Sequence, residues 1–124
     1  MGDTPRLTLT ATVLDAPDAQ ELAGFYERLL GWAREDDESE WVTLVPPAGG
    51  AGLAFQTEPN YVRPIWPAGP SDPPMMVHLD IKVDDLDAAS AHAVAAGATV
   101  AEFQPQDDVL VHLDPDGHPF CLFL

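Results

Sequence analysis

The feature that most limits how this chain can fold is an order of secondary-structure elements that occurs twice. In the first half, residues 6–16 alternate in character and predict a strand, because side chains point to opposite faces along a strand. Pro17 and Asp18 are typical of a helix start, and apolar residues at helical spacing continue to Gly31, which predicts a helix over 18–30. Three short strands are expected next, over 32–35, 41–45 and 52–56. The first half therefore has the order βαβββ.

The second half repeats this order after a connector. Residues 58–74 are rich in proline, which excludes a helix or a central strand there. A strand over 75–83 follows, and then a helix over 86–96 that two aspartates precede. The last three strands are expected over 99–103, 109–113 and 119–124. We therefore expect a single domain, residues 1–124, with module one at about 6–57 and module two at about 75–124.

The repeat also predicts which side chains share a face of a sheet. Thr8 is taken as the counterpart of His78, 70 positions further on, and Gln56 as the counterpart of Cys121. Alternation then gives each long strand an apolar face, which we expect to pack against the helices, and a polar face. The apolar face holds Leu9, Ala11, Val13, Val77, Leu79 and Ile81, and the polar face holds Thr8, Thr10, Thr12, His78 and Asp80.

The charge of the chain excludes some classes of partner. The sequence has 21 acidic and 5 basic residues, so its net charge of −16 repels nucleic acids and anionic membrane surfaces. Cys121 is the single cysteine, which excludes an intramolecular disulfide and a zinc site built from several thiolates. No segment has the pattern of a leader peptide or the length of a membrane span, so we expect a cytoplasmic protein.

Three segments in the right order resemble a known superfamily: "FYERLLGW", "HLDIKVDDLDAA" and "LDPDGHPFCLFL". The chain resembles the vicinal oxygen chelate superfamily of glyoxalases, bleomycin-resistance proteins and extradiol dioxygenases, and within it the glyoxalase-like subgroup in which "WP" precedes a strand with "HLD". The resemblance implies an α+β fold of two βαβββ modules, whose facing curved mixed sheets surround a cavity with the helices outside. It also implies a homodimer.

The resemblance further implies where a divalent metal would bind. Metal-dependent members use one position on each of the first, fourth, fifth and eighth strands, which correspond here to Thr8, Gln56, His78 and Cys121. Only His78 is an ordinary strong ligand, and with Cys121 it gives two good ligands, fewer than the three protein ligands of a catalytic zinc site. We therefore expect no metal cofactor at these four positions.

Two classes of function follow. The first is a protein that binds a small organic molecule in the cavity without a metal. The second is an enzyme, either a metal-dependent lyase, isomerase or dioxygenase of glyoxalase type or a metal-free acid–base catalyst that uses His78, the best catalytic candidate, beside Asp80. Cys121 as a nucleophile is less favoured, because a cysteine in an apolar strand usually behaves as a small hydrophobe. The residues expected at the binding site are Thr8, Thr10, Trp41, Gln56, Tyr61, Arg63, Trp66, His78, Asp80 and Cys121.

Other residues leave alternatives open. The connector with Trp66 is expected to be a lid or an anchor of the crossover, and Arg63 to attract an anionic ligand or to pair with a nearby acid. His112 is expected either to reach the cavity or to be a half-exposed strand residue. His92 is expected to face solvent on its helix, and His118 to be a polar group of a turn.

Overall fold

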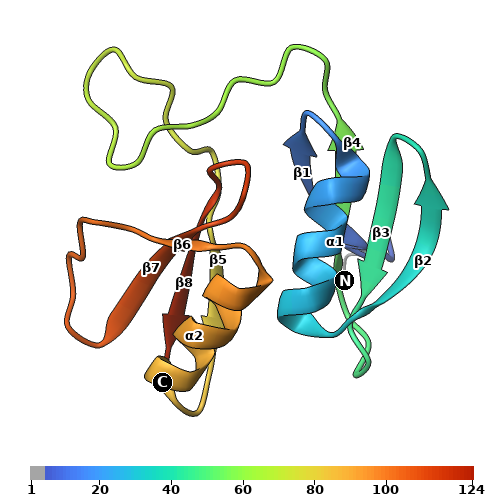
Figure 1. Cartoon of the computed structure of the whole chain (residues 1–124). Coiled ribbons are helices and arrows are strands. Elements are labelled where there is room, and N and C mark those ends of the chain that lie inside the picture. The colour runs from blue at the N-terminus through green and yellow to red at the C-terminus, as the bar shows by residue number, and fades with distance from the viewer. Residues whose placement is uncertain (1–4) are drawn as a thin grey trace.

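The computed structural model describes residues 5–124 and contains the repeated order of elements (Figure 1). Module one consists of β1 (Ala11–Ala16), α1 (Ala19–Leu30), β2 (Ala33–Glu38), β3 (Trp41–Val45) and β4 (Gly52–Thr57). Module two consists of β5 (Leu79–Lys82), α2 (Leu86–Ala96), β6 (Thr99–Val100), β7 (Val109–Leu113) and β8 (Pro119–Phe123). The connector between β4 and β5 contains no helix or strand.

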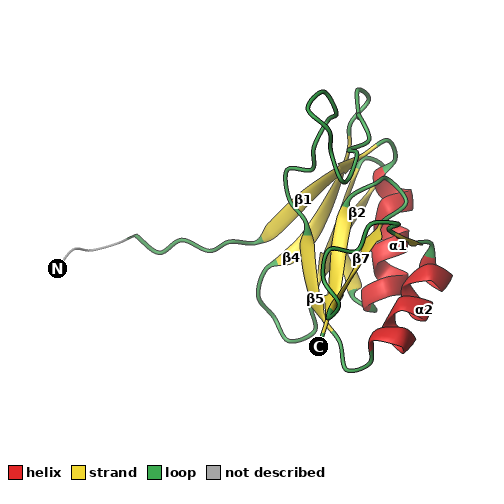
Figure 2. Ribbon diagram, turned by 90° about the vertical axis from the view of Figure 1, so that its left-hand side faces the viewer, coloured by secondary structure: helices red, strands yellow, loops and turns green. Residues whose placement is uncertain are grey.

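Each module forms one mixed sheet of four strands. The strand orders are β1-β4-β3-β2 and β5-β8-β7-β6, with β1 parallel to β4, β5 parallel to β8, and the other pairs antiparallel. Both helices lie on the same side of the sheets, as Figure 2 shows. The α+β fold class with two βαβββ modules is therefore confirmed, and the side of the sheets without helices is the open face.

Local sequence signals begin and end both helices. The Asp18 carboxylate accepts the backbone N–H groups of Gln20 and Glu21 at the start of α1, and Gly31 ends that helix in the left-handed conformation, with φ of 71°. Asp85 caps α2 in the same way by accepting the N–H of Ala88. The predicted helix boundaries therefore agree closely with the structure.

One hydrophobic core joins the two modules. Phe25 and Tyr26 of α1 are fully buried, and they contact Phe55 of module one and Phe120 of module two. The helices are also linked directly, because the Arg28 guanidinium donates two hydrogen bonds to a backbone carbonyl at the end of α2. Because aromatic rings from both modules share one core, neither module has a complete hydrophobic core of its own.

Several strands are shorter than predicted because their partners are short. β1 begins at Ala11, where it pairs with Gly52, the first residue of β4, and residues 5–10 run on as an extended, exposed segment without a strand neighbour (Figure 2). Likewise β5 begins at Leu79, which pairs near the start of β8, so residues 75–78 are outside the ladder. Since a strand is defined by its hydrogen-bonded neighbour, an alternating sequence continues past the point where the strand stops.

The predicted face of β1 was wrong. Leu14 and Ala16 are buried against the helices, whereas Val13 is 44% exposed on the open face. The predicted offset of 70 residues between Thr8 and His78 was also wrong, as the strand registers show. The ladders pair Asp15 with Gln56 and Asp80 with Cys121, so the counterpart of His78 is Val13 and not Thr8.

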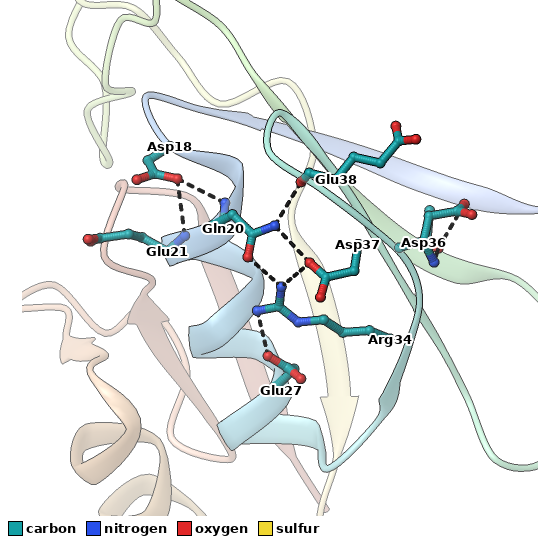
Figure 3. Close-up of polar contacts among 9 residues, drawn as sticks. Asp18, Gln20, Glu21, Glu27, Arg34, Asp36, Asp37 and Glu38 are labelled. Atoms are coloured by element: carbon teal, nitrogen blue, oxygen red, sulfur yellow. Dashed lines mark hydrogen bonds and ion pairs between the residues drawn. The ribbon is translucent and has the colours of Figure 1, made fainter.

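A network of side chains attaches the acidic strand β2 to α1 (Figure 3). Arg34 contacts Glu27 of α1 at 2.7 Å and Asp37 at 2.9 Å, and it donates a hydrogen bond to Gln20. The Gln20 amide in turn donates to Asp37 and to the Glu38 carbonyl. One arginine of the edge strand β2 thus pairs with a carboxylate of the same strand, Asp37, and with one of α1, Glu27.

Candidate functional site

A pocket of about 400 Å³ lies at the junction of the modules, and we call it the junction pocket. It is formed by β1, the start of the connector, the residues that lead into β5, and the turn between β7 and β8. Its lining is largely apolar, with a few polar groups from Asp15, Glu58, Asn60, Tyr61 and His118. The other lining residues are Val13, Leu14, Val62, Pro64, Pro74, Met75, Met76 and Val77. An apolar cavity with a few placed polar groups is typical of a small-molecule site.

A chain of hydrogen bonds runs from the core to the wall of the junction pocket. The Tyr26 hydroxyl donates to the buried Asp114 carboxylate at 2.8 Å, and the same carboxylate lies 2.8 Å from Nδ1 of His118. On the other side of the ring, Nε2 of His118 lies 3.3 Å from the Tyr61 hydroxyl, which donates to the Asp116 carbonyl at 2.7 Å. His118 is therefore oriented from both sides and forms part of the pocket wall.

The turn between β7 and β8 fixes Asp114 in place. Its carboxylate also accepts the backbone N–H groups of Asp116 at 2.9 Å and His118 at 3.0 Å, so both carboxylate oxygens have hydrogen-bond partners. Burial, followed by the charge of Asp114, raises the pKa of Tyr26 and also that of Tyr61. Both phenols therefore remain protonated donors at neutral pH.

A second group of reactive side chains lies on the open face of the other sheet. Nε2 of His78 is 3.1 Å from Oδ1 of Asp80, and the possible ligand atoms of His78, Asp80 and Cys121 all lie within 4.8 Å of one another. They line a pocket of about 360 Å³, which we call the thiol pocket, together with Gln106, Asp108, Val109, Phe123 and Leu124. Burial, and then the neighbouring Asp80 carboxylate, raise the pKa of the Cys121 thiol.

The remaining predicted residues of module one do not join either pocket. Thr8 and Thr10 lie in the exposed segment that precedes β1, where the Thr10 carbonyl accepts a hydrogen bond from the Gly52 amide. Trp41 and Gln56 face each other across the β3–β4 ladder, but they line neither pocket. The ten predicted site residues are thus divided over several places in the structure.

In the connector, Tyr61 lines the junction pocket, while Arg63 and Trp66 make contacts with module two. The Arg63 guanidinium donates to the Pro115 carbonyl at 2.7 Å, and the ring of Trp66 lies 5.8 Å from that of Phe103, measured between centroids. These contacts attach the connector to the body and give Arg63 a backbone partner instead of a carboxylate.

His112 neither reaches a pocket nor is half-exposed, so both alternatives were wrong. It is fully buried on the helix side of β7, where Nε2 lies 2.8 Å from the Ser90 hydroxyl of α2 and the ring stacks on Phe120. Burial lowers its pKa. His92 is exposed on α2 as expected, with Nε2 3.0 Å from the Leu29 carbonyl.

The four positions implied for a metal lie in different parts of the structure. Thr8 lies in the exposed segment before β1, and Gln56 belongs to the first sheet, whereas His78 and Cys121 lie together on the second sheet. The donors also fit poorly, because a hydroxyl and a neutral amide bind divalent cations weakly. Within residues 5–124, the group that could hold a metal is His78, Asp80 and Cys121.

Comparison with known proteins gives a consistent result. The family described as "Glyoxalase-like domain" matches residues 11–123. A glyoxalase/bleomycin resistance protein/dioxygenase family enzyme from Burkholderia phytofirmans PsJN is 17% identical, with a TM-score of 0.71 over 94% of this chain and 97% of that one. A glyoxalase-related enzyme from Fulvimarina pelagi is 20% identical, with a TM-score of 0.68 over 94% and 86%.

A third similar structure is an antibiotic binding protein from Streptomyces sp. CB03234, 20% identical, with a TM-score of 0.63 over 98% of both chains. Among curated proteins, none matches this sequence. At such identities the structural matches establish the fold alone. No helix among residues 5–124 is long and apolar enough to cross a membrane.

Proposed function

The chain belongs to the glyoxalase-like domain family, and from that premise we propose that it binds a small organic molecule in the junction pocket. The observation that carries this proposal is the pocket itself, which is mainly apolar, has a volume suited to a small molecule, and ends at an oriented imidazole. The antibiotic binding protein of similar fold is consistent with this type of function.

The lining favours a neutral or cationic amphipathic ligand. The described lining residues include the carboxylates of Asp15 and Glu58 and no lysine or arginine, in a chain of net charge −16. Met75 and Met76 supply flexible, polarisable side chains that suit an aromatic ring. At the polar end, an oxygen or nitrogen of the ligand would compete for the long 3.3 Å contact between Nε2 of His118 and the Tyr61 hydroxyl.

The experiment compares three fluorescent planar probes of different charge: acridine orange as the cation, 7-hydroxycoumarin as the neutral compound, and 8-anilinonaphthalene-1-sulfonate as the anion. We expect saturable binding of the first two and weaker binding of the anion. Val13→Trp fills the pocket and should weaken binding at least about tenfold. Val94→Trp is the matched control, since Val94 of α2 is 48% exposed, close to the value for Val13, and does not line the pocket.

His118→Asn should weaken binding by about 1 to 3 kcal/mol, the usual effect of losing a hydrogen bond in a buried site. If none of the probes saturates below about 1 mM, or if Val13→Trp and Val94→Trp behave alike, the junction pocket is not the binding site.

We also propose that the chain forms a homodimer. The exposed side chains of Leu7 and Leu9, 84% and 74% accessible, lie on the segment that extends away from the body (Figure 2). Apolar side chains displayed in this way favour contact with a second protein surface.

A further inference from the structure

We infer that His118 selects the ligand of the junction pocket. The pocket takes aromatic compounds that carry an O–H or N–H group, and this group donates a hydrogen bond to Nε2 of His118. The inference rests on the function proposed for this pocket, and it adds the chemical group by which a ligand is recognised. It gives a specificity-determining role to a residue of the turn between β7 and β8.

The hydrogen bonds of Asp114 determine which nitrogen of His118 carries the proton. The buried carboxylate accepts the Tyr26 hydroxyl at 2.8 Å and lies 2.8 Å from Nδ1 of His118. A carboxylate accepts hydrogen bonds and does not donate them, so Nδ1 is the protonated nitrogen. In the neutral ring, Nε2 therefore has a lone pair and acts as an acceptor.

This acceptor lacks a full hydrogen bond within the described part of the chain. Its neighbour is the Tyr61 hydroxyl at 3.3 Å, but that hydroxyl has a single hydrogen and donates it to the Asp116 carbonyl at 2.7 Å. No other partner of Nε2 is found among residues 5–124. The imidazole is 13% exposed, so its acceptor is available to a donor from outside the chain.

Nε2 is the nitrogen on the pocket side of the ring. Nδ1 points to the buried Asp114, whereas Nε2 lies beside Tyr61, which lines the junction pocket as His118 does. A donor that enters the pocket therefore approaches Nε2 next to the Tyr61 hydroxyl. The carboxylate behind Nδ1 strengthens the new bond, because hydrogen bonds in a chain polarise one another.

The other polar side chains of the pocket also favour a ligand with a donor. Asp15 and Glu58 add carboxylates, which only accept hydrogen bonds, and the Tyr61 hydrogen is already used. Asn60 supplies the side-chain amide donors of the described lining. An aromatic ring with an O–H or N–H group fits this excess of acceptors, and the apolar part of the pocket covers the ring.

The test uses the full-length chain and two pairs of neutral fluorescent compounds: 2-naphthol with 2-methoxynaphthalene, and indole with 1-methylindole. In each pair a methyl group replaces the hydrogen of the donor, and the ring system stays the same. We expect the parent chain to bind the donor member at least about fivefold more tightly, the effect of one hydrogen bond in a binding site.

Three variants show whether Nε2 causes the difference. His118→Phe keeps a planar ring without an acceptor and should bind both members of a pair alike, and circular dichroism shows whether it is folded. Tyr61→Phe removes the competing hydroxyl and should keep the preference for the donor. His92→Phe is the matched control, because it removes an exposed imidazole of α2 that does not line the pocket, and it should behave like the parent.

Each outcome bears on one claim. Equal affinities within both pairs, or a preference that persists in a folded His118→Phe, would overturn this inference and leave the proposed function standing. A preference lost in Tyr61→Phe would also overturn it, because the tyrosine oxygen would then be the acceptor. If no compound of either pair saturates below about 1 mM, the inference is wrong, and the binding of acridine orange decides separately whether the pocket takes small molecules.

Discussion

At the scale of single residues, the buried bond between Tyr26 and Asp114 offers the sharpest test of the structure. The Tyr26 hydroxyl donates to a carboxylate that is itself inaccessible to water. Tyr26→Phe removes one of the hydrogen bonds that the buried Asp114 carboxylate accepts, which should lower the free energy of unfolding by about 1 to 3 kcal/mol. Tyr61→Phe, at a half-buried position, should cost less than about 1 kcal/mol. Urea denaturation of the two variants measures both values, and equal losses would contradict the described burial.

His112 predicts a pH dependence of stability. Its pKa is lowered in the folded state by burial, so the unfolded chain binds the proton more readily. The folded state therefore loses stability as the pH falls through about 6.5, the pKa of the histidine in the unfolded chain. A variant with a non-titrating residue at position 112 should not show this loss.

The measurement compares the chain with His112→Gln between pH 8 and pH 5. We expect the free energy of unfolding of the parent to fall more steeply than that of the variant over this range. Parallel curves would show that His112 is no less basic in the folded protein than in the unfolded chain.

The residues of the junction pocket show what sequence reasoning omits at this scale. His118 follows a turn in the sequence and was interpreted as a polar turn residue, yet it is held by an aspartate whose other partner, Tyr26, is 88 residues away in the chain. His78 and Asp80 were expected on the same face of one strand, because that placement depends only on alternation, and their side chains lie 3.1 Å apart. Contacts made within a strand could be predicted, and contacts between modules could not.

At the scale of elements, Gly52 shows that the close packing of β3 and β4 leaves no space for a side chain at this position. A Cβ at this position would collide with the backbone carbonyl of Leu44 in the neighbouring strand β3. Gly52→Ala must therefore displace backbone, and we expect it to lower the free energy of unfolding by about 2 to 3 kcal/mol.

The matched variant is Gly24→Ala in the middle of α1, where the added methyl group meets a side-chain nitrogen of Arg28, Nη1, and no backbone atom. There alanine should leave the stability unchanged or raise it by up to about 1 kcal/mol, because glycine is a poor helix former. Thermal or urea unfolding of both variants gives the comparison, and a neutral Gly52→Ala would contradict the close approach of β3 and β4.

Helices were predicted more accurately than strands for a physical reason. The signals that begin and end α1 and α2 are local, namely an aspartate before the first turn and a glycine after the last. The limits and the buried face of β1 depend on distant residues. Val13 and Leu14 are both apolar, so the pattern within the strand does not determine which of them is buried, and the helix on one side decides it.

At the scale of the whole molecule, the exposed segment before β1 makes the proposed dimer testable. Light scattering in about 0.15 M and about 0.5 M salt should give twice the mass of one chain, with tighter association at the higher salt because the charge of −16 is screened. The double change Leu7→Asp and Leu9→Asp should shift the protein toward the monomer. Val94→Asp, on an exposed face of α2, should not. A monomer at every concentration of the parent chain would exclude the dimer.

The bond between Tyr26 and Asp114 also matters for how the protein is made. Translation releases α1 first, while its acceptor, 88 residues further on, has not yet been added to the chain. Until module two emerges from the ribosome, the aromatic face of α1 lacks Phe120 and its hydroxyl lacks a partner. A chain truncated before Asp114 therefore leaves the aromatic face of α1 uncovered. Exposed apolar surface of this kind is bound by chaperones and is prone to aggregation.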